Sequence, residues 1–195
     1  MTKPKPANPA LSISHPDLAS ALEQIGTEVD NQPLRSSALA RIMRETFHGS
    51  DAGGAWDWRM AYDMMQAAAI QVLLRGAGAT ADIANAKLLA SRLLTETRRS
   101  EQQIRLQQFS TPLPFAALAL RAAAVRKGET VLEPSAGTGA LAAFAARAGA
   151  TLVLNEIDPF RQSLLRAVFG GDVTGHDSEH IDDLLQTPVL PDVVV

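Results

Sequence analysis

The stretch VLEPSAGTGALAAF, from Val131 to Phe144, joins a β-prone run to an alanine-rich helical run through a loop with two glycines. Gly137 and Gly139, followed by Ala142, fit the pattern G-x-G-x-x-A, in which the missing side chains let a backbone loop approach a ligand. A strand, a tight loop and a helix N-terminus together favour a nucleotide-cofactor site. Alone, the pattern is weak, because NAD-binding folds share it.

From Glu129 onward, short β-like runs alternate with helical runs. The alternation predicts parallel βαβ units with right-handed connections, and hence an α/β region over residues 106–195. The candidate strands are TVLE, TLVLNE, DVTGHD and PDVVV, and the candidate crossover helices are ALAAFAARAG and PFRQSLLRAVFGG.

The preceding part, residues 16–105, is predicted to be all-helical, and the proline-rich residues 1–15 are predicted to be a disordered lead-in. Apolar residues recur at helical spacing in HPDLASALEQIGTEV, SSALARIMRETFHG, AWDWRMAYDMMQAAAIQVLLRG and TADIANAKLLASRLLTETRRS. The predicted caps are Ser36 or Ser37 and Thr80 or Asp82, and the predicted helix ends are Gly49 and Gly76. We expect Trp56 in the core and Trp58 at its rim, on different sides of one helix.

The composition excludes several classes of site. The chain has 195 residues, a net charge of −3 and no cysteine. Disulfides and thiolate metal sites are therefore excluded, and His176 and His180 are interpreted as solvated loop residues rather than metal ligands. We expect a cytoplasmic protein with no membrane span. The arginines 92, 98, 99 and 105 form either a solvated helix face or a phosphate-binding stripe.

Two carboxylates discriminate between cofactors. Glu156 ends the second candidate strand, where an acidic residue accepts hydrogen bonds from ribose hydroxyls. Glu133 precedes the first loop glycine by four positions. Its charge would repel the pyrophosphate of NAD but attract the sulfonium and ammonium groups of S-adenosylmethionine. This argument favours S-adenosylmethionine, and the alternatives are NAD and a βαβ turn without a ligand.

Three neighbouring features fit a cofactor at this loop. Ile157 can lie against an adenine face, and Asp177 can either accept from the adenine amino group or cap the helix that begins at SEH. Thr111 is predicted as an N-cap with Pro112 at the first helical position. The free N–H groups of that helix start can hold a carboxylate.

In their order along the chain, QQFSTP, VLEPSAGTGAL, LNEID and GHD resemble the cofactor half of adenine-N6 DNA methyltransferases with gamma-type motif order. Together with GSDAGGAWDWRMAYDMMQAA and TRRSEQQIRLQQFSTP, they are similar to the N-terminal region of bacterial strawberry-notch-like methylase/helicase proteins. The resemblance extends from about Phe47 onward. It implies a Rossmann-like, S-adenosyl-L-methionine-dependent methyltransferase half-sheet after an all-helical region.

The resemblance also implies roles for individual residues. The implied cofactor contacts are Phe109, Ser110 and Thr111 at the methionine part, Glu133, Pro134, Ser135, Ala136, Gly137 and Gly139 around it, Glu156 at the ribose, and Ile157 and Asp177 at the adenine. The implied partner is nucleic acid, DNA in preference to RNA, bound through the full-length protein.

The sequence departs from the family pattern in one respect. In such enzymes the fourth strand ends in Asn-Pro-Pro-aromatic, which holds the target amino group and stacks on the flipped base. Here the fourth candidate strand is PDVVV, ending at Val195, and neither Asn-Pro-Pro nor a P-loop motif occurs. We therefore expect a cofactor-binding portion, inactive by itself, with the catalytic motif after Val195. The alternative is a non-catalytic S-adenosylmethionine-binding or protein-interaction module.

Overall fold

The structure is a computed structural model that describes residues 15–76, 82–96, 110–185 and 190–195. The predicted lead-in therefore lies outside the described residues, except for His15, where the first helix begins. The elements are α1 His15–Asn31, α2 Ser36–Thr46, α3 Trp58–Arg75, α4 Asp82–Arg92, α6 Leu113–Ala123, β1 Thr130–Glu133, α7 Ala140–Ala148, β2 Thr151–Asn155, α8 Pro159–Phe169, β3 Val173–Thr174, the 3-10 helix η3 Ser178–His180, α9 Ile181–Leu184 and β4 Val193–Val194.

The four strands form one parallel sheet in the order β3-β2-β1-β4. In the register of the central pair, Thr130 lies beside Thr151 and Glu133 beside Leu154. The α/β class and the parallel sheet are thus confirmed. From β1 the chain turns to β2 on one side, whereas β4 pairs with β1 on the other. Ligands of open parallel sheets bind at the carboxyl ends of the strands where the order reverses, which here is between β1 and β4.

Two helices connect the strands and cover the sheet. Helix α7 packs on β1 and β2, and α8 packs on β3. The start of α8 is capped by Asp158, whose Oδ1 accepts hydrogen bonds from the N–H groups of Phe160 and Arg161. Gly149 ends α7 with a φ of +85°, a conformation that glycine adopts without strain.

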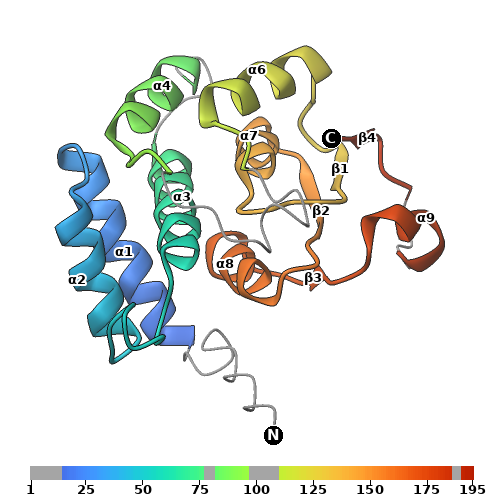
Figure 1. Ribbon diagram of the computed structural model, residues 1–195. Helices are drawn as coiled ribbons and strands as arrows, with labels where there is room; N and C mark the ends of the chain where they lie inside the picture. The colour runs from blue at the N-terminus through green and yellow to red at the C-terminus, as the bar shows by residue number, and fades with distance from the viewer. Residues whose placement is uncertain (1–14, 77–81, 97–109, 186–189) are drawn as a thin grey trace, which may run out of the picture.

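Helix α3 joins the helical part of the chain to the sheet part. Figure 1 shows α3 between the α1–α2 pair and the helices α7 and α8. Nearly every residue of α3 from Met60 to Leu73 is buried, because partners cover it on several sides. One hydrophobic cluster includes side chains from α1, α2, α3, α4, α6, α7, α8 and β1. The two predicted regions therefore share a continuous core.

The tryptophan prediction is confirmed for burial but wrong for the helix. Trp56 is buried and Trp58 is partly exposed. However, α3 begins only at Trp58, with Asp57 as its N-cap. The two rings therefore meet edge to face, with centroids 5.6 Å apart. Each indole N–H has a partner, since Trp56 donates to Gly49 O and Trp58 donates to Asp51 Oδ2.

Several predicted helix ends differ from the structure. The N-cap position of helix α2 is Arg35, without a side-chain cap, rather than Ser36 or Ser37, and the helix ends at Thr46, before Gly49. Gly76 does end α3, as predicted. Asp82 is the first residue of α4, and Thr80 lies outside the described residues. Helix α4 ends at Arg92, so the predicted helical run through Leu94 and beyond is too long.

Arg92 has a structural role. Its guanidinium donates to the backbone oxygens of Val29 and Asp30, at the carboxyl-terminal end of α1. This position satisfies carbonyls that the helix leaves free, and it suits the negative end of the helix dipole. The arginines 98, 99 and 105 lie outside the described residues.

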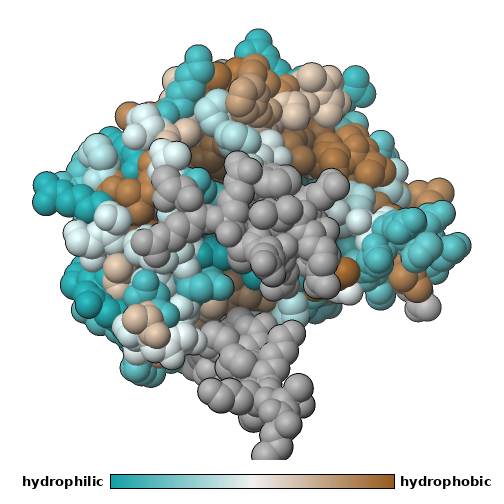
Figure 2. Space-filling view, viewed as in Figure 1, coloured by the Kyte–Doolittle hydropathy of each residue, from teal (hydrophilic) through white to brown (hydrophobic). Residues whose placement is uncertain are grey.

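The surface over α4 and α6 exposes large apolar side chains. Phe115 is 66% exposed, and Leu88 and Leu118 are about half exposed. Figure 2 shows hydrophobic surface at the top of the molecule, where α6 lies. Among the described helices, none is long and apolar enough to cross a membrane.

Candidate functional site

The residues 134–139, here called the glycine loop, follow β1 at the carboxyl edge of the sheet. Both of its glycines have positive φ, +57° at Gly137 and +91° at Gly139. A Cβ at Gly139 would lie 2.5 Å from a ring carbon of Phe169, so this glycine allows the loop to pack on α8. A Cβ at Gly137 would have its nearest neighbour at 3.9 Å, on Arg161. A Cβ at Gly137 would thus make an ordinary van der Waals contact without a clash.

Glu133, the last residue of β1, is buried beneath this loop with 4% of its surface exposed. Its Oε2 accepts a hydrogen bond from the N–H of Ala142, at 2.9 Å. Burial raises the pKa of this carboxyl to about 8, the Ala142 hydrogen bond opposes the rise, and the nearby Glu156 adds to it. Glu133 is consequently mostly protonated at neutral pH. The negative charge expected from the sequence is therefore mostly absent without a ligand, so Glu133 does not by itself repel a pyrophosphate, but a nearby cation favours its ionised form.

Glu133 also lines a small cavity of about 50 Å³. The walls of this cavity come from the glycine loop and from the segment before α6: Ser110, Thr111, Glu133, Ser135, Ala136, Gly137, Thr138, Ala140 and Leu141. A second cavity, of about 220 Å³, has Ser110, Thr111, Thr138 and Ala140 in common with it and reaches Gln66 of α3 and Glu96. The hollow beside the glycine loop is therefore bounded by residues of both parts of the chain.

The segment before α6 begins its helix one residue later than predicted. Pro112 is the N-cap and Leu113 the first helical residue, with no side-chain cap. The prediction of Thr111 as a capping side chain is therefore wrong. Its cause is the extended backbone of Pro112, with ψ of 137°, which places the proline outside the helix. Thr111 instead lines both cavities. Phe109 lies outside the described residues.

Glu156 follows β2 and connects two loops. Its Oε2 accepts from the N–H of Gly137 at 2.7 Å, and its Oε1 accepts from the N–H of Asp158 at 2.8 Å. Burial raises the pKa of this carboxyl, and these hydrogen bonds and Arg161 oppose the rise. Each oxygen retains capacity for a further hydrogen bond, such as one from a ribose hydroxyl. The sequence indicated a hydrogen-bond acceptor at this position, but not that the same side chain binds the backbone of the glycine loop.

Asn155, which sequence reasoning missed, ties the three strand ends together. Its side-chain amide donates to Pro134 O at 2.8 Å and to His176 O at 2.9 Å. Its Oδ1 accepts from the Thr174 hydroxyl and from the N–H of His176. Because Asn155 is fully buried, its polar atoms have to find partners within the protein. The available sequence signal was a polar asparagine at the end of the apolar run TLVLN.

The two residues expected at the adenine lie farther out on the same edge. Ile157 is 47% exposed, directly after Glu156. Asp177 is the N-cap of η3, and its Oδ1 accepts from the N–H of Glu179 at 3.1 Å. The capping interpretation of Asp177 is thus confirmed. His176 and His180 flank Asp177, and the described residues contain no group of three or more potential metal ligands.

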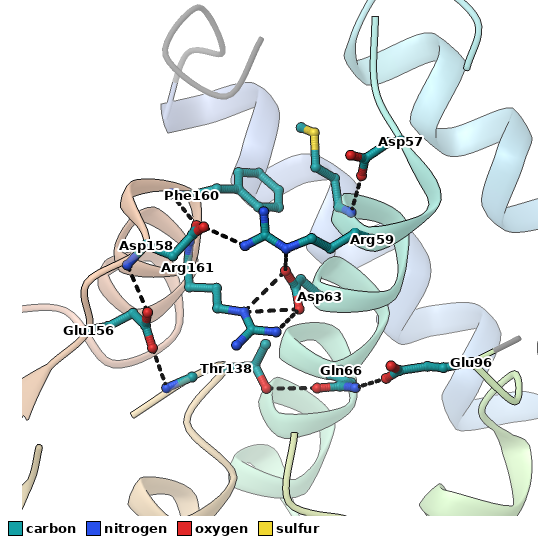
Figure 3. Close-up of polar contacts among 12 residues, drawn as sticks. Asp57, Arg59, Asp63, Gln66, Glu96, Thr138, Glu156, Asp158, Phe160 and Arg161 are labelled. Atoms are coloured by element: carbon teal, nitrogen blue, oxygen red, sulfur yellow. Dashed lines mark hydrogen bonds and ion pairs between the residues drawn. The ribbon is translucent and has the colours of Figure 1, made fainter. Parts of the chain in front are cut away.

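The residues that α3 contributes were also missed from the sequence. Arg59 pairs with Asp158, Asp63 pairs with Arg161, and Gln66 accepts from the hydroxyl of Thr138 at 2.9 Å (Figure 3). Arg161 Nη2 lies 2.8 Å from Asp63 Oδ1, and Nε lies 3.2 Å from both carboxylate oxygens. Although burial alone would lower the pKa of Arg161, Asp63 raises it above its usual value. Burial raises the pKa of Asp63, and Arg161 and Arg59 oppose this rise. The close contacts of both carboxylate oxygens with the Arg161 guanidinium favour the ionised pair.

Comparison with protein-family models, with curated proteins and with solved structures finds no match for this chain.

Proposed function

We propose that this chain is the S-adenosylmethionine-binding part of a Rossmann-like methyltransferase that acts on adenine N6 in nucleic acid. The observation that carries the proposal is the convergence of Ser110, Thr111, Glu133 and Gly137 on one cavity at the carboxyl edge of the sheet. These residues come from two segments separated by a whole helix, α6. The cavity lies beside β1, where the strand order reverses.

The donors and acceptors around this cavity suit the methionine end of the cofactor. Glu133 supplies a carboxyl group for an ammonium ion, and the hydroxyls of Ser110 and Thr111 can donate to a carboxylate. An approaching ammonium lowers the pKa of Glu133 from about 8, so binding would ionise this residue and release a proton. A pyrophosphate at the same position would not form the ion pair that an ammonium forms with Glu133, and it would keep the carboxyl protonated.

The rest of the carboxyl edge offers positions for the nucleoside. Glu156 retains hydrogen-bonding capacity towards a ribose, Ile157 offers an exposed apolar side chain, and Asp177 has a second carboxylate oxygen beyond its cap. Bound S-adenosylmethionine supplies an activated methyl group. The chain's own residues bind and orient that donor, and orientation is a major part of the rate enhancement in transfer reactions. We propose DNA as the partner, in preference to RNA, bound through the full-length protein.

Equilibrium dialysis with tritiated S-adenosylmethionine tests the cofactor, and tritium transfer to adenine-containing DNA and RNA tests the reaction. We expect retention of label that S-adenosylhomocysteine displaces and NAD does not. Displacement by NAD alone, or no retention of label, would contradict the proposal. Retention without transfer, both by this chain and by one extended with an Asn-Pro-Pro-aromatic segment, would instead indicate a non-catalytic S-adenosylmethionine-binding module.

A further inference from the structure

We infer that Arg59, Asp63 and Gln66, here called the α3 stripe, are positioning residues for the glycine loop and for the loop that precedes α8. The helical part of the chain would then be an integral component of the cofactor site rather than an appended domain. The inference rests on the proposed function where it names the cofactor, but the positioning itself can be measured without a ligand.

The three residues occupy one face of one helix. Their spacing, four residues and then three, is the spacing that aligns side chains along a helix. Figure 3 shows all three directed from α3 towards the sheet edge. Each reaches a different point: Arg59 the capping residue Asp158, Asp63 the side chain of Arg161, and Gln66 the hydroxyl of Thr138.

These points surround the residues that we place at the cofactor. Thr138 lies between Gly137 and Gly139, and all three residues belong to the glycine loop. Asp158 also donates its N–H to Glu156, which in turn holds Gly137. The Arg161 guanidinium lies beneath Gly137, 3.9 Å from where a Cβ would be. The glycine loop is thus held from one side by Glu156 and from the other by α3.

Burial makes these contacts rigid. The side chains of Asp63, Thr138, Asp158 and Arg161 are each at most 5% exposed. Water therefore cannot readily replace a lost partner, and polar groups buried without partners are unfavourable by about 1–3 kcal/mol. Two glycines in left-handed conformations would otherwise leave this loop with many accessible conformations. A rigid loop binds its ligand without a further loss of conformational entropy.

The test uses Gln66→Met and Thr138→Val, alone and together. Both substitutions approximately conserve volume, and each removes the hydrogen bond between Gln66 and Thr138, while Gln66→Met also removes the hydrogen bond from Gln66 to Glu96. The matched control is Gln71→Met, because Gln71 lies on the same helix and donates across to Ala167 O in α8, away from the loop. The first measurement is amide hydrogen exchange at Gly137 and Gly139. The second is the dissociation constant for S-adenosylhomocysteine.

We expect faster exchange at both glycines and a two- to tenfold weaker dissociation constant in each single variant, about the loss of one hydrogen bond. The double variant should be no weaker than Gln66→Met alone, because Thr138→Val removes a contact that Gln66→Met has already removed. Gln71→Met should match the wild type in both measurements. Unchanged amide exchange at the two glycines in the variants would overturn the inference. If the wild type binds S-adenosylhomocysteine, an unchanged dissociation constant in the variants would also overturn it. If the wild type does not bind S-adenosylhomocysteine, the proposed function fails, and the exchange rates alone decide whether α3 positions the loop.

Discussion

The N–H of Ala142 donates a hydrogen bond to Glu133 Oε2 at 2.9 Å, joining the end of β1 to the first turn of α7 beneath the glycine loop. This hydrogen bond is available whether the carboxyl is protonated or ionised. Only the ionised form, however, is penalised by burial, and the pKa of Glu133 is accordingly raised to about 8. An uncharged side chain of the same shape would avoid this penalty. Stability therefore gives no reason for an acid at position 133, whereas a bound ligand does.

Replacement of this acid changes how stability depends on pH. Below pH 4.5 the carboxyl is protonated in both the folded and the unfolded chain, so its titration does not change the free energy of unfolding there. Between pH 4.5 and 8 the folded state holds one more proton than the unfolded state, so the free energy of unfolding decreases as pH rises. Glu133→Gln removes this contribution. We expect the variant to be more stable than the wild type at pH 8, with a gain that disappears at pH 4.5.

Urea denaturation at the two pH values measures this gain. Glu23→Gln, an exposed substitution on α1, is the matched control and should leave the pH dependence of the wild type unchanged. An equal effect of Glu133→Gln at both pH values would show that Glu133 is not protonated in the folded protein.

For the Asp63–Arg161 pair, we predict that a single substitution destabilises the protein and that replacement of both residues restores stability. Asp63→Asn leaves the Arg161 guanidinium buried without its compensating charge, and such a change typically destabilises by about 3–5 kcal/mol. Replacing both, as Asp63→Leu with Arg161→Met, removes the desolvated charges together. We expect the double variant to recover most of the lost free energy of unfolding, measured by denaturant titration. Simple addition of the effects of Asp63→Leu and Arg161→Met, each measured alone, would contradict a direct pairing.

The two loop glycines predict different outcomes for the same substitution. Gly139→Ala places a Cβ 2.5 Å from Phe169, so it should destabilise the fold strongly. Gly137→Ala meets no atom closer than 3.9 Å and should lose only about 1–2 kcal/mol for the left-handed backbone. The Gly137 variant should therefore remain folded but lose cofactor affinity, because alanine disfavours the left-handed backbone of a residue that lines the proposed cofactor cavity. Thermal denaturation and a binding titration distinguish these outcomes. Equal stability of the two variants would mean that Gly139 does not pack on α8 as described.

Glu156 predicts a combined loss of stability and binding. In Glu156→Gln one side-chain oxygen becomes an NH₂ group, which cannot accept from the N–H of Gly137 or Asp158. We expect the free energy of unfolding to fall by about 1–3 kcal/mol and cofactor affinity to fall with it. Asp177→Asn is the control for stability, because asparagine caps a helix as well as aspartate does. Full stability of Glu156→Gln would show that the carboxylate does not hold the loop.

Local patterns predicted the elements that depend on short stretches of sequence. β1 coincides with TVLE, α7 and α8 begin within a residue of the predicted runs, and Gly76 ends α3. Helix starts were less predictable. At Ser36 and Thr111 the residue type favours a cap, but the backbone reaches its helical conformation at a neighbouring residue.

Contacts between residues far apart in the sequence could not be predicted from local patterns. Asp63 and Arg161 are 98 positions apart, and nothing in either local pattern indicates that they meet. A signal was present, since Arg59, Asp63 and Gln66 share one face of an otherwise apolar helix. Such a face predicts a buried polar contact but not its partner. Likewise, the sequence places Glu133 before the glycines, but only the structure shows its burial, which raises the pKa of the carboxyl to about 8.

The central claim is that this loop binds the methionine end of S-adenosylmethionine against Glu133. Isothermal titration calorimetry with S-adenosylhomocysteine, at neutral pH in two buffers of different ionisation enthalpy, tests it most directly. We predict binding with net proton release in the wild type, because an ammonium ion lowers the pKa of Glu133 from about 8. Glu133→Gln should bind more weakly and without that release, and NAD should give no binding heat. Tight binding of NAD, or binding of S-adenosylhomocysteine with the same proton balance in both proteins, would contradict the account.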